Sequence, residues 1–399
     1  MTGRERLAVA MRHGSPDRTP VMCQLAIGHY FLHSGLDPVE VWHDTPTFVE
    51  ALLRLQQRYG FDGILVNLSG RDPDWRAHVD RIERDADGAR VVWRDERITE
   101  VPPDDNPHVY QPDGRTRFFP TFAELDPARL WYVDPHDISG ITYPWVWGFA
   151  EAPASPADFF PPWQDAALRL ARERAPDVSV HGEVFSPFSQ LMELLDFEQA
   201  LTALIDDPGK VEACLARLAR GGAELMTILA QAGADAILIS SAFAGAGFIS
   251  PDHYRRFVLP YEMGMVEAFR GAFPDLPVYT HTCGAIGDRL ELLEATGTNG
   301  IDTLDPPPLG DVELADAKQR IGGRLFIKGN MDPVNTLLAG PPERVRADAL
   351  SRIAVAAPGG GYILSTACSV PPATPPQHIV ELRHAADIAA DAENADSPG

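Results

Sequence analysis

Cysteine is scarce in this sequence: among 399 residues it occurs only at positions 23, 214, 283 and 368. Four widely spaced cysteines are too few for a disulfide framework in a chain of this length. Long apolar runs are also lacking, which excludes a membrane-spanning helix, and the first twenty residues contain no apolar core of a secretion signal. We therefore expect a cytoplasmic protein with reduced thiols, which in that compartment more often bind metal or take part in catalysis than form bridges.

Basic residues are in short supply as well. Lysine and arginine together number 34, against 57 aspartates and glutamates, and the formal net charge is −23. Nucleic acids and acidic membrane surfaces bind proteins through basic patches. We therefore expect neither nucleic acid nor a membrane as a partner.

Eight short apolar segments rich in β-forming residues recur along the chain, and amphipathic helical patterns separate them. Several of these helical patterns end in glycine, a frequent helix C-cap. Strands that alternate with helices at this spacing predict a (β/α)₈ barrel, the TIM-barrel fold. A doubly wound open sheet is the alternative, but no glycine-rich dinucleotide motif follows the first segment. The expected strands are residues 20–27, 63–69, 178–186, 236–243, 277–283, 300–305, 324–330 and 361–369.

One region interrupts this alternation. Residues 71–165 are rich in proline, aspartate and aromatic residues, and residues 89–102 alternate like a β-hairpin. We expect an insertion after the second strand of a single domain, residues 1–390, followed by a disordered tail, residues 391–399. The tryptophans of the insertion either form a small core of their own or make an aromatic lid over the barrel mouth; they are Trp75, Trp93, Trp131, Trp145, Trp147 and Trp163.

A histidine and two of the four cysteines fall at the ends of predicted strands. His281 and Cys283 lie two residues apart at the end of the fifth strand, and residues i and i+2 of a strand project to one face. Cys368 stands at the end of the eighth strand. Active sites of TIM barrels are built at this end of the strands. One imidazole and two thiolates are a donor set suited to Zn²⁺.

The sequence resembles the uroporphyrinogen decarboxylase superfamily over nearly its whole length apart from the insertion. The similarity rests on DRTPVM, FDGILV, GADAILIS, ISPDHYRRFVLPY, HTCG, KGNMDP and GGYILSTACSVPPATPPQHI. Within that superfamily, His-x-Cys followed by a late cysteine is similar to the zinc-dependent methylcobamide:thiol methyltransferases, such as those that serve coenzyme M. The resemblance implies that His281, Cys283 and Cys368 are zinc ligands.

True decarboxylases of this superfamily are a poorer match. They bind a tetrapyrrole with many carboxylates, and the family places an arginine-bearing segment directly after the first strand. In this sequence the segment reads CQLAIGHYFLHSG, residues 23–35, and contains no arginine. A polyanionic substrate would therefore lack the contacts that guanidinium groups provide.

Other polar residues at strand ends are candidates for the same site. A zinc ion with two thiolates and one neutral histidine has no net charge, and a substrate thiol in its open position would be held as a nucleophile. Glu183, after the third strand, and Asp305, after the sixth, are alternatives for a resting fourth ligand, or they orient other groups. Glu183 and Asn330 are the candidate catalytic residues, and His181 shares a strand face with Glu183 but could equally be a core histidine.

The leading hypothesis is a zinc-dependent methyltransferase that moves a methyl group between a small thiol and a methylated corrinoid or similar donor. Corrinoid carrier domains present a histidine in an Asp-x-His-x-x-Gly motif, and in DPHDISG, residues 134–140, the glycine is one place too late. We therefore expect the corrinoid on a separate carrier protein. The alternatives are a uroporphyrinogen-type decarboxylase and a non-catalytic barrel that binds a tetrapyrrole or a carrier.

Overall fold

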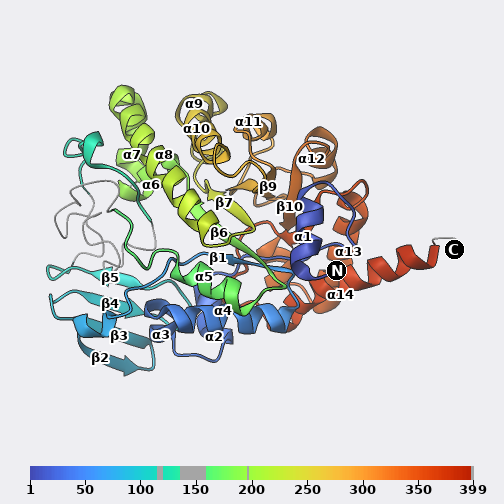
Figure 1. Ribbon diagram of the computed structural model, residues 1–399, viewed down its shortest axis with the longest axis horizontal. Coiled ribbons are helices and arrows are strands. Elements are labelled where there is room, and N and C mark those ends of the chain that lie inside the picture. The colour runs from blue at the N-terminus through green and yellow to red at the C-terminus, as the bar shows by residue number, and fades with distance from the viewer. Residues whose placement is uncertain (115–119, 135–158, 196, 397–399) are drawn as a thin grey trace.

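The centre of the protein is a curled sheet of seven parallel strands, surrounded by helices (Figure 1). The computed structural model describes residues 1–114, 120–134, 159–195 and 197–396. In sheet order the strands are β1 (Gly63–Val66), β6 (Ser179–Phe185), β7 (Ala236–Ser240), β8 (Val278–Thr282), β9 (Gly300–Thr303), β10 (Phe326–Met331) and β11 (Tyr362–Thr366). Nearly every residue of these strands is buried, as expected for a parallel sheet that is covered on both faces.

The predicted parallel α/β architecture is confirmed, but the first predicted strand is wrong. Residues 20–27 make only isolated bridges to neighbouring backbone, and we call residues 20–26 the closing segment. Met22 N–H donates to the carbonyl of Leu364 in β11 (3.1 Å), while Asp62 N–H, just before β1, donates to the carbonyl of Val21 (2.8 Å). The closing segment therefore links the two edge strands without forming a regular ladder.

Helices lie outside the sheet and follow its strands in turn (Figure 1). Those after the closing segment are α2 (Ile27–His33), α3 (Pro38–His43) and α4 (Thr45–Tyr59). The later ones are α5 (Ala166–Arg174), α6 (Pro187–Leu194), α7 (Phe197–Asp206), α8 (Pro208–Gln231), α9 (Pro251–Phe257), α10 (Leu259–Arg270), α11 (Leu290–Ala295), α12 (Leu314–Arg320), the π-helix η5 (Pro333–Leu338), α13 (Pro342–Ala356) and α14 (Pro376–Asp396).

Helix α14 extends into residues 391–399, the predicted disordered tail. Residues 391–396, which we expected to be disordered, form the end of α14, and residues 397–399 lie outside the described residues. None of the helices in the described ranges combines the length and the apolar character needed to cross a lipid bilayer.

A second, antiparallel sheet lies between β1 and α5 in the sequence. It consists of β2 (Val79–Asp85), β3 (Gly88–Trp93), β4 (Ile98–Val101) and β5 (His108–Tyr110), with short 3₁₀ turns at Trp75–His78 and Pro127–Arg129. The strands β3 and β4 pair where we expected a hairpin. Trp75 and Trp93 pack around His43 of α3 and are part of the main apolar core, so these two tryptophans form no separate core of their own. Trp145 and Trp147 lie outside the described residues.

Helix α1 (Gly3–Met11) covers the amino ends of the parallel strands. Its Leu7, Ala10 and Met11 form one buried apolar cluster with interior side chains of the sheet and the closing segment; these are Met22, Leu65, Ala236, Leu238, Tyr279, Phe326 and Ile363. The Thr2 hydroxyl accepts from Glu5 N–H and the Glu5 carboxylate accepts from Thr2 N–H, which makes a capping box at the start of α1. The interior of the curled sheet is thus apolar and packed at its amino end.

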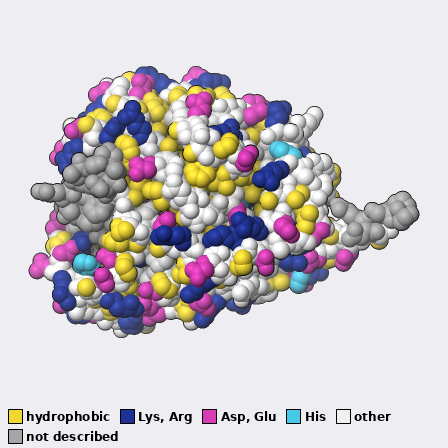
Figure 2. All heavy atoms as spheres, viewed as in Figure 1, with side chains coloured by type: hydrophobic (Ala, Val, Ile, Leu, Met, Phe, Trp, Pro, Cys, Tyr) yellow, Lys and Arg dark blue, Asp and Glu magenta, His cyan; other side chains and the backbone are white. Residues whose placement is uncertain are grey.

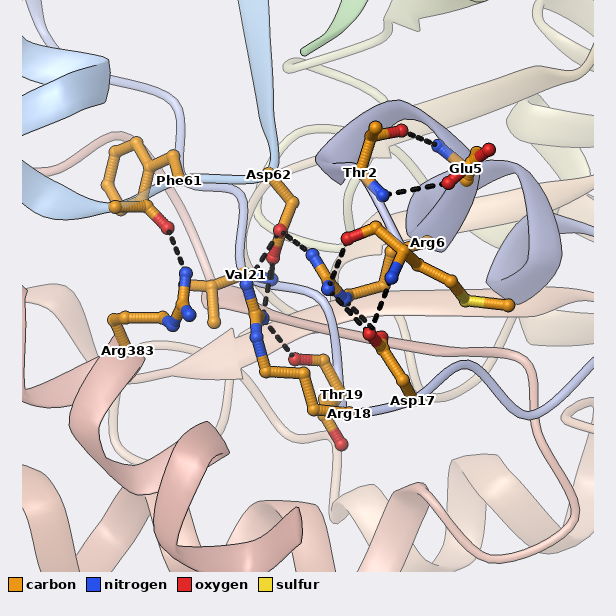
Figure 3. Close-up of polar contacts among 12 residues, drawn as sticks. Thr2, Glu5, Arg6, Asp17, Arg18, Thr19, Val21, Phe61, Asp62 and Arg383 are labelled. Atoms are coloured by element: carbon orange, nitrogen blue, oxygen red, sulfur yellow. Dashed lines mark hydrogen bonds and ion pairs between the residues drawn. The ribbon is translucent and has the colours of Figure 1, made fainter. Parts of the chain in front are cut away.

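One buried carboxylate ties α1 and the closing segment to the sheet (Figure 3). Asp62 accepts hydrogen bonds from the Arg6 guanidinium (2.6 Å) and twice from that of Arg18 (both 2.7 Å), and its Oδ2 also accepts from Val21 N–H (2.8 Å). The Asp62 side chain is 3% exposed, and both arginines are nearly as buried. Arg6 reaches Asp17 as well, at the protein surface.

Asp62→Asn should lower the free energy of unfolding by about 3–5 kcal/mol, because it leaves two buried guanidinium groups without their shared counter-charge. Chemical denaturation would measure this change. Asp17→Asn is the matched control: it removes a partner of the same Arg6, but the Asp17 side chain is 43% exposed, so a cost under about 1 kcal/mol is expected. Equal losses in the two variants would contradict this account of Asp62.

Candidate metal centre

Side chains from two non-adjacent strand ends meet at the carboxyl end of the curled sheet. His281 Nε2 lies 3.3 Å from Cys283 Sγ, and Cys283 Sγ lies 3.7 Å from Cys368 Sγ. One ligand atom from each of the three residues lies within 4.8 Å of the others. Two sulfur atoms bound to a tetrahedral zinc at about 2.3 Å would be roughly 3.8 Å apart. The donor types and their spacing therefore fit a zinc ion.

The imidazole of His281 contacts charged groups in the interior of the sheet. Its Nδ1 lies 3.3 Å from Asp302 Oδ2, and the same oxygen accepts from Lys328 Nζ at 2.8 Å. The three residues stand opposite one another in the register of β8, β9 and β10, and each side chain is at most 6% exposed. A metal-binding histidine commonly donates its second ring nitrogen to a carboxylate, which fixes the orientation of the ring. Asp302 is placed for that role.

These contacts set the protonation of the site in this structure. Burial disfavours the His281 cation, but hydrogen bonds to Asp302 and Cys368 outweigh it and raise the pKa of His281 to about 10. The Asp302 carboxyl is buried too, yet Lys328 and His281 lower its pKa to about 2. The Cys283 thiol donates to Cys368 Sγ, so the pKa of Cys368 falls well below its ordinary value while that of Cys283 rises. The site thus stabilises a thiolate at Cys368.

The turn after β8 presents Cys283. Gly284 follows it with φ +77°, in the left-handed region, and its N–H donates to Asp305 Oδ2 at 2.6 Å. The loop after β7 packs against the other side, since a Cβ on Gly245 would lie 2.4 Å from the Cys283 carbonyl oxygen. The loops after β7 and β9 therefore fix this turn.

Cys368 is held by a different set of groups. Ala367 N–H donates to the Met331 carbonyl of β10, and Val370 N–H donates to the Gln24 carbonyl of the closing segment. Beyond the cysteine, His29 of α2 binds the carbonyls of Pro371 (3.2 Å) and Pro372 (3.0 Å) through Nδ1. The closing segment and α2 therefore position the second cysteine.

The two candidates for a fourth ligand lie outside the three-residue cluster. Asp305 is 4% exposed and bonds the Gly284 amide; burial raises the pKa of its carboxyl to about 6, against the effect of that hydrogen bond. Glu183, near the end of β6, lines a small cavity beside β1. Neither carboxylate joins the group of ligand atoms within 4.8 Å.

Asn330 is engaged by protein groups. Its Nδ2 donates to the Leu304 carbonyl at 2.8 Å, and its Oδ1 accepts from Arg352. The residue is fully buried. Since Leu304 precedes Asp305, Asn330 positions the loop that supports Gly284 rather than facing a ligand. The neighbouring Asp332 caps the start of η5.

The remaining candidates are core residues. His181 bonds Ser179 Oγ (3.0 Å) and Tyr279 Oη (2.9 Å), and burial lowers its pKa to about 3. Cys214 is fully buried in α8, and Cys23 is 3% exposed in the same main core. Residues 135–140, which contain most of DPHDISG, lie outside the described residues.

Sequence reasoning missed Asp302 and Lys328. A signal was present, because each is a charged residue within a short apolar strand, GIDT or FIKGNM. Charged side chains are almost never fully buried unless they are paired. Two opposite charges in neighbouring buried strands therefore indicate an internal ion pair.

Known proteins resemble this chain in sequence. A family model described as uroporphyrinogen decarboxylase (URO-D) matches residues 150–388, more than half of the chain. Identity is 31% over 193 residues to the uroporphyrinogen decarboxylase of Chlorobium phaeovibrioides, covering 46% of this chain and 51% of that protein. Identity is 28% over 222 residues to the methylcobamide:CoM methyltransferase of Methanosarcina barkeri, covering 55% and 62%. The alignments thus span about half to three fifths of these relatives.

Solved structures agree on the fold. A methyltransferase from Methanosarcina mazei superposes with a TM-score of 0.70 at 19% identity, covering 97% of this chain and 99% of that one. A B12-independent methionine synthase from Shewanella sp. W3-18-1 gives a TM-score of 0.53 at 13% identity. At these identities the likeness concerns the fold alone.

The double substitution Asp302→Asn/Lys328→Met removes both buried charges at once, so the fold should be retained. It also removes the carboxylate that orients His281, and we expect the affinity for Zn²⁺ to fall about 10–100-fold. Competition with a chromophoric chelator would measure that affinity. Asp252→Asn, a change at a carboxylate that is 91% exposed at the start of α9, is the control and should leave it unchanged. Unaltered zinc affinity in the double variant would show that Asp302 has no role in positioning His281.

Proposed function

Because the chain belongs to the uroporphyrinogen decarboxylase family, we propose that it is an enzyme of that family that transfers a methyl group to or from a thiol at a zinc ion. The convergence of His281, Cys283 and Cys368 at the carboxyl end of the sheet carries this proposal. The relationship to a methylcobamide:CoM methyltransferase supports it.

Some side chains of the site would bind the metal, and others keep those ligands in position. The Nε2 atom of His281 and the two sulfur atoms would bind the zinc, which supplies a positive charge that makes a substrate thiol acidic near neutral pH. Asp302 keeps the His281 ring aimed at the cysteines, and Lys328 balances the charge of Asp302. With two thiolates the donor set offsets the dication, so a bound sulfur stays electron-rich and nucleophilic.

Burial of the site favours transfer over side reactions. His281 is 5% exposed, and both cysteines are only partly accessible. A small thiol can enter such a recess, while bulk water has little access to the reacting atoms. We propose Glu183 and Asp305 as alternatives for a resting fourth ligand that the thiol displaces. For Glu183 a catalytic contact with substrate stays part of the proposal, whereas Asn330 acts by positioning the Asp305 loop.

The methyl donor is proposed to come from outside this chain. A methylated corrinoid on a separate carrier protein, docked over the carboxyl end of the sheet, is consistent with residues 1–390 acting as one domain. The insertion of residues 71–165 is then an elaboration of that domain. On the face in Figure 2, lysine and arginine side chains are mixed with acidic ones, so this face offers no uniformly basic surface to a polyanion.

The second candidate function is decarboxylation of a porphyrinogen, which the names of several relatives suggest. Helix α2, which follows the closing segment, argues against porphyrinogen decarboxylation. Helix α2 has the sequence IGHYFLH without an arginine, and its His29 is bonded to the Cys368 loop and to Tyr59. A tetrapyrrole with many carboxylates would find no guanidinium group on this helix.

Cys283→Ser or Cys368→Ser should lose most of the bound zinc and the methyl transfer to thiols, with little change in the free energy of unfolding. A metal at the open end of the sheet does not hold the apolar core together. Zinc content would be measured by elemental analysis and transfer by mass spectrometry of the methylated thiol. Cys214→Ser is the control, which should keep zinc and activity but lower stability by placing a hydroxyl in the core.

X-ray absorption at the zinc edge, with and without added thiol, separates this proposal from a structural metal site. A catalytic zinc should gain a third sulfur neighbour when thiol is added, because one position is open. An unchanged spectrum, or full zinc content in both site variants, would refute the proposed methyltransferase.

Uroporphyrinogen should not be converted to coproporphyrinogen under conditions in which a genuine decarboxylase is active. The reason is the lack of arginine on α2 described above. Chromatography of the oxidised porphyrins would follow the reaction. Turnover at an enzymatic rate would instead establish the second candidate function.

A further inference from the structure

The two cysteines of the candidate metal centre touch each other. Cys283 Sγ lies 3.7 Å from Cys368 Sγ, although the two residues are 85 positions apart in the sequence. A disulfide bond joins two sulfur atoms at about 2.05 Å. The sulfur atoms therefore need only a short approach to form a covalent bond, and no other part of the fold has to separate to let them meet.

The position of both cysteines in loops permits this approach. Cys283 directly follows β8, and Cys368 is the second residue after β11. Hydrogen bonds hold the neighbouring backbone at Gly284 and Ala367, while the polar contacts of the Cys283 sulfur are with His281 Nε2 and with Cys368. Rotation about each Cα–Cβ bond, with small shifts in the two loops, would bring the sulfur atoms together.

Exposure distinguishes this pair from the other cysteines. Cys283 and Cys368 are partly exposed, whereas Cys23 is 3% exposed and Cys214 is fully buried. The reaction of a thiol with a dissolved oxidant depends on access to its sulfur. An oxidant from solution therefore reaches the pair at the carboxyl end of the sheet before it reaches the two core thiols.

A zinc ion and a disulfide exclude each other at this pair. Zinc binds cysteine as the thiolate, and a disulfide sulfur carries no such charge. A bond between Cys283 and Cys368 would thus remove two of the three proposed ligands and leave His281 alone. Conversely, two sulfur atoms bound to one zinc ion stay roughly 3.8 Å apart, too far for a bond. The same two side chains either hold the metal or bind each other.

We propose that Cys283 and Cys368 form a reversible disulfide that releases the zinc, and that the oxidant is a small symmetrical disulfide, the oxidised form of a thiol substrate. This inference rests on the zinc site of the proposed function and adds regulation to that site. Disulfides in reducing compartments are usually transient and sense the redox state. An enzyme that uses a thiol would in this way stop when its thiol has been oxidised.

The bridge forms in two exchange steps. The sulfur of one cysteine attacks a sulfur of the small disulfide, breaks its S–S bond and releases one small thiol. The sulfur of the second cysteine then attacks the first cysteine in the mixed disulfide and releases the other small thiol. The metal-free protein gives up two electrons and two protons, which convert the small disulfide into two thiols. In the zinc form Zn²⁺ leaves, and water supplies the two protons.

The test treats the zinc-loaded and the metal-free protein with 2-hydroxyethyl disulfide, the oxidised form of 2-mercaptoethanol. A chromophoric chelator would follow zinc release, and mass spectrometry of unreduced peptides would identify the linked cysteines. We expect a linked pair of peptides that contain Cys283 and Cys368, together with loss of zinc in step with its formation. Reduction with dithiothreitol should restore zinc binding, because both thiolates return.

Two single variants separate a bridge from other oxidation. Cys283→Ser and Cys368→Ser each keep one cysteine of the pair, so the reaction should stop at the mixed disulfide and give no linked peptides. Cys214→Ser is the matched control: its cysteine lies in the core of α8, and the variant should form the bridge as the parent protein does.

The outcomes distinguish this inference from the proposed function. If zinc binds the reduced protein but oxidation yields only mixed disulfides, or links to Cys23 or Cys214, the switch is wrong and the proposed function stands. If the bridge forms while zinc stays bound, the two sulfur atoms are not its ligands, and the proposed function and the switch fall together. If the reduced protein binds no zinc at all, the proposed function fails at its first step and leaves the switch nothing to release.

Discussion

The carboxylate of Asp302 organises the interior of the curled sheet. A buried charge is stable only when it is paired, and Asp302 satisfies this by binding Lys328 and His281 at once. The three residues are neighbours in register across β8, β9 and β10. A slip of one residue in either pairing would turn a charged side chain toward the surrounding helices, so the ion pair and the strand register support each other. The orientation of the imidazole follows from this arrangement.

The two cysteines reach the same point through separate supports. Cys283 depends on the turn at Gly284 and on Asp305, which in turn depends on Asn330 holding the Leu304 carbonyl. Cys368 depends on the closing segment and on α2. Neither support uses a sulfur atom, so the thiols are free for chemistry. The site is thus the meeting point of two structural units that are distant in the sequence.

Much of the fold could be predicted, because strands buried on both faces are nearly continuous apolar runs. The metal cluster could be predicted because side chains at i and i+2 share a face and strand ends gather at one edge. The predictions that differ from the structure do so for local reasons. Residues 20–27 are apolar like a strand, but Val21 N–H bonds the side chain of Asp62 instead of a neighbouring strand. Asn330 was misjudged because hydrogen bonds from outside its strand decide which way its amide faces.

Helix α1 closes the amino end of the sheet with Leu7, Ala10 and Met11, so the described part of the chain leaves the polar layer above to be approached from the opposite end. Under the proposed activity both reactants share that one entrance. A carrier protein that docks over it blocks the passage of anything small. If transfer runs toward the thiol, the thiol must then arrive before the donor, and the methylated product must leave after the carrier has departed. Under the proposed activity such geometry would impose an ordered sequential kinetic mechanism, in which excess donor slows turnover by trapping the enzyme without its thiol.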